Sequence, residues 1–243
     1  MTMTLPMTLM LLVTAVFLLL ERMAPGRALP ESHGWYLRAL SINAVQLIST
    51  LLAGQVWPRM FGGVSVFALA GLGRPALEGL VAWFVGTFVF YWWHRLRHRQ
   101  GFWVVFHQVH HSPSRIEVVT SFYKHPVEIA TNTLASAVVL YGLLGCSLPG
   151  TVWYNLFAAT GEYFYHANVR TPPWLRYIVQ TPELHSIHHQ TNLHWFNFGD
   201  IPLWDRLFGT YRDALEFAPS CGFTAGTERH LGQMLLFREV SED

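Results

Sequence analysis

The sequence predicts an all-α integral membrane protein, with about four or five membrane helices and a cytoplasmic helical cap rich in histidine. Composition is the first reason. Of the 243 residues, 51% are hydrophobic and only 13% are charged, whereas soluble domains contain about 25% charged residues. The second reason is that apolar stretches recur at close to the roughly 20 residues that span a hydrocarbon core. A net charge of +1 excludes a nucleic-acid groove built on bulk positive charge, and two cysteines exclude a disulfide framework.

Five apolar segments are the expected membrane helices. Residues 5–20 have no basic region before them and no small-residue cleavage site after them, so we expect a retained helix rather than a cleaved signal peptide. The other four segments are residues 36–57, 76–93, 127–144 and 152–165, of which the last is short enough to dip into the bilayer. Residues 59–74 contain several glycines and are expected to form a loop or an interfacial helix.

Basic residues alternate between the loops and predict the orientation. Three loops on one side contain most of them: Arg22, Arg27 and Arg38; Arg95, Arg97, Arg99, Arg115 and Lys124; Arg170 and Arg176. The opposite loops contain only Arg59 and Arg74 or no charge. Because cytoplasmic loops are the basic ones, we expect the N-terminus outside and the C-terminus, with the histidine-rich regions, on the cytoplasmic side.

Histidine is the most informative residue type, because eight of the 13 histidines fall into three clusters. The clusters are His94 and His98; His107, His110 and His111; and His185, His188 and His189. Residues at positions i, i+3 and i+4 share a helical face, so each cluster on a helix would point its rings at one place. Thr181 and Pro182 are typical of a helix start before the last cluster, and Pro113 ends the second.

These clusters indicate metal binding. Neutral imidazoles packed beside a membrane would leave polar nitrogens unpaired unless something binds them. Eight nitrogens exceed what one metal ion uses, so two metal ions explain the number best. Imidazole binds zinc, copper, iron and nickel alike, so the ligand type alone does not select the metal.

The order of these motifs resembles the fatty acid hydroxylase/sterol desaturase superfamily over about residues 80–212. The resemblance also includes Phe122-Tyr-Lys-His125-Pro126, Asn197-Phe-Gly199 and Trp204-Asp-Arg-Leu-Phe-Gly-Thr-Tyr211. It implies an integral membrane, non-haem di-iron enzyme that uses O2 and two electrons to hydroxylate or desaturate a lipid. By this resemblance, the eight clustered histidines would hold two irons per chain.

Four further residues are candidates beside this ligand set. His166 matches a family position that often provides a ligand as part of an H-x3-H pair, but Arg170 occupies the second position here. His125 and His194 are each candidates for a ligand or for a residue that orients one. Glu162 lies inside the fifth segment, where a carboxylate is costly, and is a candidate for a hydrogen bond to a ligand or for a polar contact between helices. No catalytic residue beyond the metal ligands is predicted.

The expected organisation has three parts: N-terminal membrane helices with an interfacial loop at 1–75, a catalytic domain at 76–212, and a cytoplasmic C-terminal tail at 213–243. The sequence contains no nicotinamide, flavin or iron–sulfur motif. We therefore expect electrons from a separate ferredoxin or cytochrome b5 type donor with its reductase. The expected docking surface consists of Arg95, Arg97, Arg99, Arg115 and Lys124. A sterol, a fatty acyl chain, a ceramide-like lipid, an alkylglycerol and a hydroxylated aminolipid all remain open as substrates.

The main alternative is a non-enzymatic membrane metal carrier or transporter. Transporters bind their cargo near the bilayer midplane, whereas these clusters lie at the ends of predicted spans among arginines. A b-type haem carrier needs only one histidine from each of two facing helices, and a zinc hydrolase would need a general-base glutamate within a metal motif, such as HExxH. Both readings explain the clusters less well than an oxygen-dependent lipid enzyme.

Overall fold

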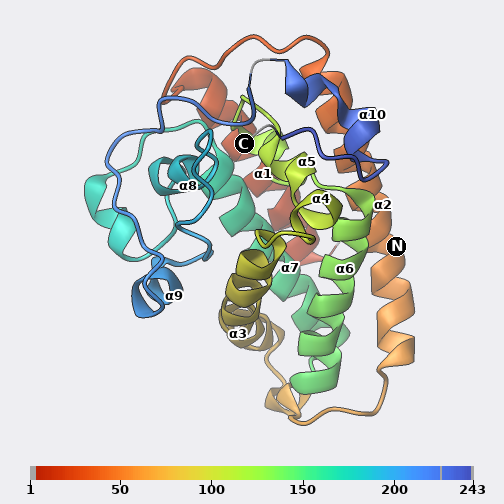
Figure 1. The fold of residues 1–243 in the computed structure, drawn as a ribbon. Helices are drawn as coiled ribbons and strands as arrows, with labels where there is room; N and C mark the ends of the chain where they lie inside the picture. Colours follow the sequence, from red (N-terminus) through yellow and green to blue (C-terminus); the bar gives the residue numbers. More distant parts are fainter. Residues whose placement is uncertain (1–3, 225, 242–243) are drawn as a thin grey trace.

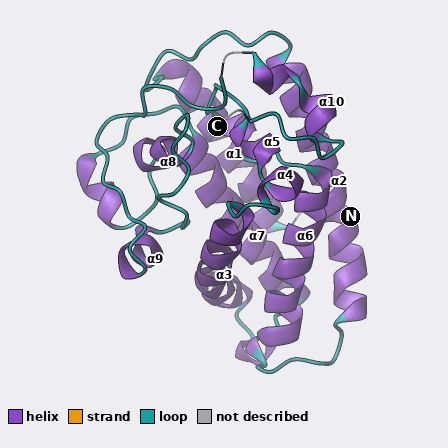
Figure 2. Cartoon of the chain, in the orientation of Figure 1, coloured by secondary structure: helices purple, strands orange, loops and turns teal. Residues whose placement is uncertain are grey.

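The computed structural model describes residues 4–224 and 226–241, and this part of the chain is helical and contains no named strand (Figures 1 and 2). The all-α prediction is therefore confirmed. Five long helices form one bundle: α1 (Leu5–Met23), α2 (Trp35–Met60), α3 (Pro75–Arg97), α6 (Pro126–Ala137) and α7 (Leu148–His166). A π-helical segment, η3 (Val138–Leu143), extends α6.

Most of the short helices gather around one end of the bundle and form the cap (Figure 1). They are α4 (Trp103–Phe106), α5 (Gln108–His111), η2 (Val118–Thr120), η4 (Pro173–Tyr177), α8 (Pro182–His188), α9 (Pro202–Leu207), η5 (Thr227–Arg229) and α10 (Leu231–Met234). The loop between α2 and α3 lies at the opposite end and contains one short turn, η1 (Leu69–Leu72). All three histidine clusters therefore belong to the cap or to the helix ends that meet it.

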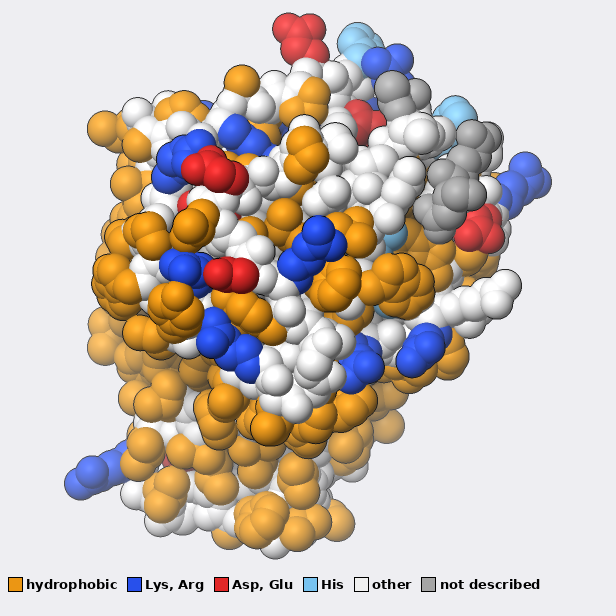
Figure 3. Space-filling model, turned by 60° about the vertical axis from the view of Figure 1, so that its left-hand side comes forward, with side chains coloured by type: hydrophobic (Ala, Val, Ile, Leu, Met, Phe, Trp, Pro, Cys, Tyr) orange, Lys and Arg blue, Asp and Glu red, His pale blue; other side chains and the backbone are white. Residues whose placement is uncertain are grey.

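Three helices, α1, α2 and α3, are long and apolar enough to cross a membrane. Their outer faces are strongly exposed and apolar, as at Leu47, Leu51 and Leu52 of α2, which are each 60% exposed. Figure 3 shows hydrophobic side chains dominating the surface below a band of basic side chains. These features support an integral membrane protein. The other two predicted segments are also helical and form α6 with η3, and α7. The predicted count of four or five membrane spans is not confirmed, because only three helices are long and apolar enough among the described residues.

Close packing between α3 and α7 positions the centre of the bundle. A Cβ atom on Gly79 of α3 would lie 2.5 Å from Trp153 Cβ of α7, so only glycine permits this approach. At the preceding residue, the buried carboxylate of Glu78 accepts hydrogen bonds from the Ser147 backbone N–H at 3.0 Å and from the Ser147 hydroxyl at 2.6 Å. The carboxylate thus binds at the positive N-terminal end of α7 and fixes the register of the two helices.

Candidate metal centre

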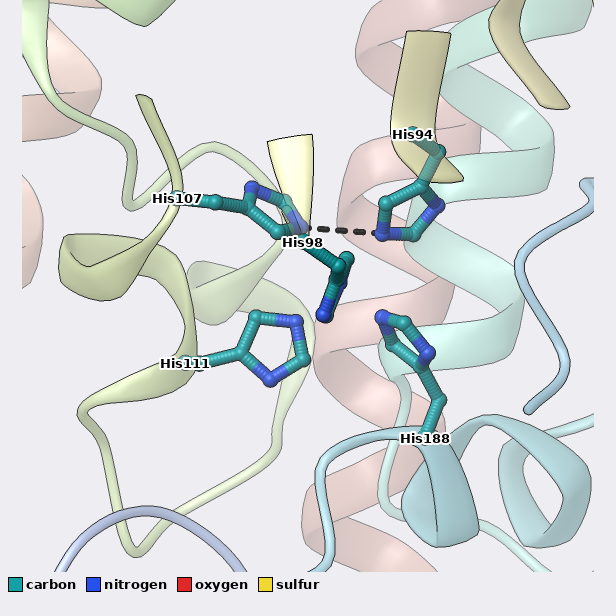
Figure 4. A group of neighbouring side chains, drawn as sticks. All are labelled: His94, His98, His107, His111 and His188. Atoms are coloured by element: carbon teal, nitrogen blue, oxygen red, sulfur yellow. Dashed lines mark hydrogen bonds between the residues drawn. The ribbon is translucent and has the colours of Figure 1, made fainter. Parts of the chain in front are cut away.

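The cap brings nine histidines together in two adjacent groups. The first group contains His94, His98, His107, His111 and His188 (Figure 4), and the second contains His110, His166, His185 and His189. Within each group, the potential ligand atoms all lie within 4.8 Å of one another. The structure therefore assembles all eight clustered histidines and adds His166, which enters from the C-terminal end of α7.

Each H-x2-H-H motif divides its rings between the two groups, which differs from the expectation that its three rings point at one place. His107 and His111 join the first group and His110 the second. The later motif has the opposite division, with His188 in the first group and His185 and His189 in the second. Successive residues of a helix are rotated by roughly 100°, and the chain also breaks its helix at His107 (φ −137°, ψ −18°) between α4 and α5.

Hydrogen bonds to main-chain oxygens determine which ring nitrogens face the first group. His94 Nδ1 donates to the Phe198 carbonyl oxygen at 2.7 Å. His188 Nδ1 donates to the Phe196 carbonyl oxygen at 2.8 Å. A carbonyl oxygen can only accept, so each Nδ1 holds the proton and each neutral ring has a bare Nε2.

His107 follows the same pattern with a carboxylate. Its Nδ1 lies 3.0 Å from Glu128 Oε1 and donates to it, which leaves a bare Nε2 that lies 2.9 Å from His94 Nε2 (Figure 4). Two lone pairs at this distance repel unless a cation lies between them. Two imidazole nitrogens bound to one metal at about 2.0–2.1 Å would lie roughly 2.9–3.4 Å apart, so this spacing fits a shared metal ion.

The second group converges through its Nε2 atoms. His166 Nε2 lies 3.3 Å from His110 Nε2 and 3.1 Å from His185 Nε2. His189 Nε2 also lies 3.1 Å from His185 Nε2. His166 Nδ1 donates to the Glu162 carbonyl oxygen at 2.8 Å, so its Nε2 is again the bare nitrogen.

The nine rings are buried, and many of their nitrogens have no hydrogen-bond partner among the described residues. None of the nine is more than 8% exposed. The unpartnered atoms that belong to the first group include both nitrogens of His111 and Nε2 of His98 and His188. Because an unpaired buried polar atom costs free energy, and because imidazole nitrogen is a ligand for transition metals, the residues present fit bound metal ions.

Burial also holds these rings in the neutral form that binds metal. It lowers the pKa of His188 from its ordinary value to about 3. It lowers the pKa well below the ordinary range for His98, His107, His110, His111, His185 and His189, and interactions with neighbouring histidines and basic side chains lower it further. At neutral pH these rings are therefore neutral, and each has one unprotonated nitrogen that can bind a metal ion.

Glu128 is a functional candidate that the sequence interpretation missed. Its carboxylate, 0% exposed, holds His107 and also forms a buried ion pair with the Arg97 guanidinium. The guanidinium neutralises the carboxylate, as expected for a paired charge in the interior. A signal was present in the sequence, because Glu128 is an acidic residue inside the apolar segment 127–144.

The structure corrects the expected basic docking surface. Arg97 is buried against Glu128, and Lys124, 6% exposed, donates to Glu162 Oε1 at 2.9 Å. Arg115 is half-buried against Glu117, and Arg95 is half-buried over aromatic rings. Arg99 is the exposed member of the predicted set. The number of basic residues predicted surface charge poorly here, because three of the five side chains form ion pairs: Arg97 with Glu128, Arg115 with Glu117 and Lys124 with Glu162.

The three remaining candidates lie outside both groups. His125 caps α6, its Nδ1 accepting from the Val127 backbone N–H at 3.0 Å. The His194 ring centroid lies 5.1 Å from that of His111, beside the first group. Glu162 positions His166 through its carbonyl oxygen, while its carboxylate binds Lys124.

A cavity of about 530 Å³ reaches both groups from between the long helices. Its walls come from α1, α2, α3, α6 and α7, and its lining includes His94 and His107 of the first group and His110, His166 and His185 of the second. Its volume falls within the range of about 300–1,000 Å³ typical of ligand pockets. A lipid chain in this cavity would lie next to both groups of histidines.

Comparison with known proteins matches the part of the chain that contains these groups. The fatty acid hydroxylase family model matches residues 79–210, which is over half of the chain. The chain is 32% identical over 143 residues to the ornithine lipid hydroxylase of Rhizobium tropici, covering 57% of this chain and 43% of that protein.

Two further relatives have different reactions in their names. The chain is 28% identical over 136 residues to the alkylglycerol monooxygenase of Homo sapiens, covering 53% of this chain and 29% of that protein. It is 28% identical over 140 residues to a very-long-chain aldehyde decarbonylase of Oryza sativa subsp. indica, covering 51% of this chain and 21% of that protein. The chain thus spans less than half the length of each of these relatives. No solved structure matches it.

Proposed function

This chain belongs to the fatty acid hydroxylase family, and from that premise we propose that it is a membrane-bound, O2-dependent oxidoreductase that hydroxylates or desaturates a lipid at a di-iron centre. One observation supports this proposal most strongly. Two buried histidine groups, of five and four rings, lie side by side at the end of a cavity that runs between apolar helices. Two adjacent histidine groups that can bind metal ions, beside a cavity large enough for a lipid chain, suit oxidation of an unactivated C–H bond.

In this proposal the first group holds one iron and the second group holds the other. Iron accepts up to six ligands, so neither five nor four histidines would saturate it. When bound, the two irons would activate O2 for attack on the substrate C–H bond, with two electrons supplied from outside. The protein would supply binding, orientation and a dry pocket.

The chain's own residues prepare this site. The carbonyl oxygens of Phe196 and Phe198 and the carboxylate of Glu128 each hold a proton on Nδ1 of one ring and so aim its Nε2 inward. Such outer contacts orient ligands and tune their basicity. The cavity walls would hold the lipid chain beside the rings and exclude water, so that placement selects which carbon reacts.

Electron supply and orientation complete the proposal. Residues 76–212 would form the catalytic domain, with a separate ferredoxin or cytochrome b5 type protein and its reductase as donor. The cap would face the cytoplasm, with the N-terminus outside and residues 213–243 as a cytoplasmic tail. The loop between α1 and α2 supports this arrangement, because Arg27 donates to the Ala218 carbonyl oxygen of the cap at 3.0 Å and thus places this basic loop on the histidine side.

The substrate is proposed as a sterol, a fatty acyl chain or a related lipid. The test compares lipid extracts from cells that contain the protein, its His188→Ala variant or neither. We expect species that gain one oxygen or lose two hydrogens only with the unaltered protein. Identical extracts from all three would refute an oxygenase, and metal accumulation that depends on His188 without any new lipid would favour the carrier alternative.

A further inference from the structure

A second cavity, of about 360 Å³, lies between α1, α3 and α7 and is not used by the reaction described above. Its membrane side is almost entirely apolar, with walls that include Phe17, Leu80, Trp83, Phe157, Gly161 and Phe164. Leu80 is 46% exposed on the outer face of α3, so this wall reaches the surface that contacts the bilayer. The volume and the lining suit a hydrocarbon chain.

The cap end of this cavity is polar and incompletely paired. Gln180 is 1% exposed, and its Nε2 donates to the Asn197 carbonyl oxygen at 2.9 Å. Its Oε1 is buried without a hydrogen-bond partner among the described residues. Asp200 lines the same end, where its Oδ1 accepts from the Tyr165 hydroxyl at 3.1 Å. A buried acceptor without a donor costs free energy, so this end fits a ligand that donates a hydrogen bond.

The indole of Trp83 adds a complementary group. Its Nε1 is a buried donor that also has no partner among the described residues, and Trp83 lines the same cavity. An oxygen atom of a lipid could accept from it. The cavity therefore offers both an unused acceptor and an unused donor on otherwise apolar walls.

The second cavity borders the cavity of the histidine groups. Tyr165 and Asp200 line both cavities. The Tyr165 ring centroid lies 4.5 Å from that of His185 in the second histidine group. A lipid in the second cavity would thus be separated from the metal centre by this pair of side chains.

We propose that the second cavity binds the hydrocarbon chain of one bilayer amphiphile whose hydroxyl or amino group, lying beside Asp200, donates a hydrogen bond to Gln180 Oε1. The inference goes beyond the proposed function, because it assigns a second lipid site beside the cavity that would hold the substrate. The lipid class is a long-chain amphiphile with a hydrogen-bond donor. Binding itself is independent of oxidation and can be measured separately.

The test uses the purified full chain in lipid nanodiscs and two photoreactive probes. One probe is a long-chain alcohol with a diazirine in its chain, and the other is the matching hydrocarbon without the hydroxyl. Cross-linked peptides are mapped by mass spectrometry. We expect the alcohol to label the segments of α3 and α7 around Trp83 and Phe157 several times more than the hydrocarbon.

Two variants separate the polar end from the apolar walls. Gln180→Leu should lower labelling by the alcohol to that by the hydrocarbon, a loss of about two- to tenfold for one hydrogen bond. Gly161→Leu should fill the cavity and abolish labelling by both probes. Gly161→Ala is the control, because its Cβ would lie 3.9 Å from Tyr165 Cε1, an ordinary contact.

Equal labelling by the two probes, or alcohol labelling unchanged in Gln180→Leu, would overturn the proposal. If Gly161→Leu fails to fold, the Gln180 comparison still decides it. Labelling of the second cavity without any oxidised lipid in cells would support the binding site while refuting the oxygenase. Oxidised lipid in cells without labelling of the second cavity would support the oxygenase and refute this binding site.

Discussion

Replacing Glu128 tests how the first histidine group is held. Glu128→Ala removes the acceptor of the His107 Nδ1 proton, at 3.0 Å, and leaves the Arg97 guanidinium, 5% exposed, without its partner. Breaking a buried ion pair costs about 3–5 kcal/mol, and loss of an outer contact to a metal ligand lowers metal affinity by about 10–100-fold. The variant should therefore be less stable and should bind one metal ion more weakly.

The effect should be confined to one of the two metal ions, because His107 belongs to the first group only. Metal titration of the purified protein in detergent should show one site of unchanged affinity and one weakened site. Glu128→Gln should weaken that site less than Glu128→Ala, because its amide oxygen can still accept from His107. Glu239→Gln is the control, since Glu239 is exposed. Equal weakening of both sites would refute the division into groups, and lower stability with unchanged affinity would refute a positioning role for Glu128.

Four further predictions follow from the same geometry. His188→Ala should abolish lipid oxidation and weaken one metal site, whereas His33→Ala, at an exposed side chain, should do neither; equal losses would indicate general folding damage. Gly79→Ala should lower the thermal midpoint, at a cost of about 1–3 kcal/mol, because its Cβ would overlap Trp153, whereas Gly54→Ala has no atom within 4 Å and should not. Purified protein with lipid, O2 and NAD(P)H should be inactive until a ferredoxin or cytochrome b5 type donor and its reductase are added, and turnover without them would refute the proposed electron supply. Metal-depleted protein should lose thermal stability as the pH falls below the ordinary histidine pKa of 6.5. Burial lowers the pKa of the clustered rings in the folded protein, to about 3 for His188, so the unfolded chain binds more protons than the folded one. A thermal midpoint that stays constant from pH 7 to 5 would contradict this.

Local patterns were sufficient to predict the helices and the histidines that cluster. Each long helix lies within a few residues of an apolar run, because a segment in lipid must satisfy its own backbone hydrogen bonds and the helix does so locally. Pro126 and Pro182 stand in the first turns of α6 and α8, where proline costs no hydrogen bond. The eight clustered histidines were visible for the same reason, since their spacing is short.

The partition of those histidines depended on tertiary structure. His94 is oriented by the carbonyl oxygen of Phe198, 104 positions away, and His107 by Glu128, which is 21 positions away on another helix. His166 joins the second group although its sequence pair is incomplete at Arg170. Spacing along a helix determines only the direction in which a side chain points around the axis of that helix. Which rings meet, and which oxygens hold them, depends on how distant segments pack, and that information is not present in any single motif.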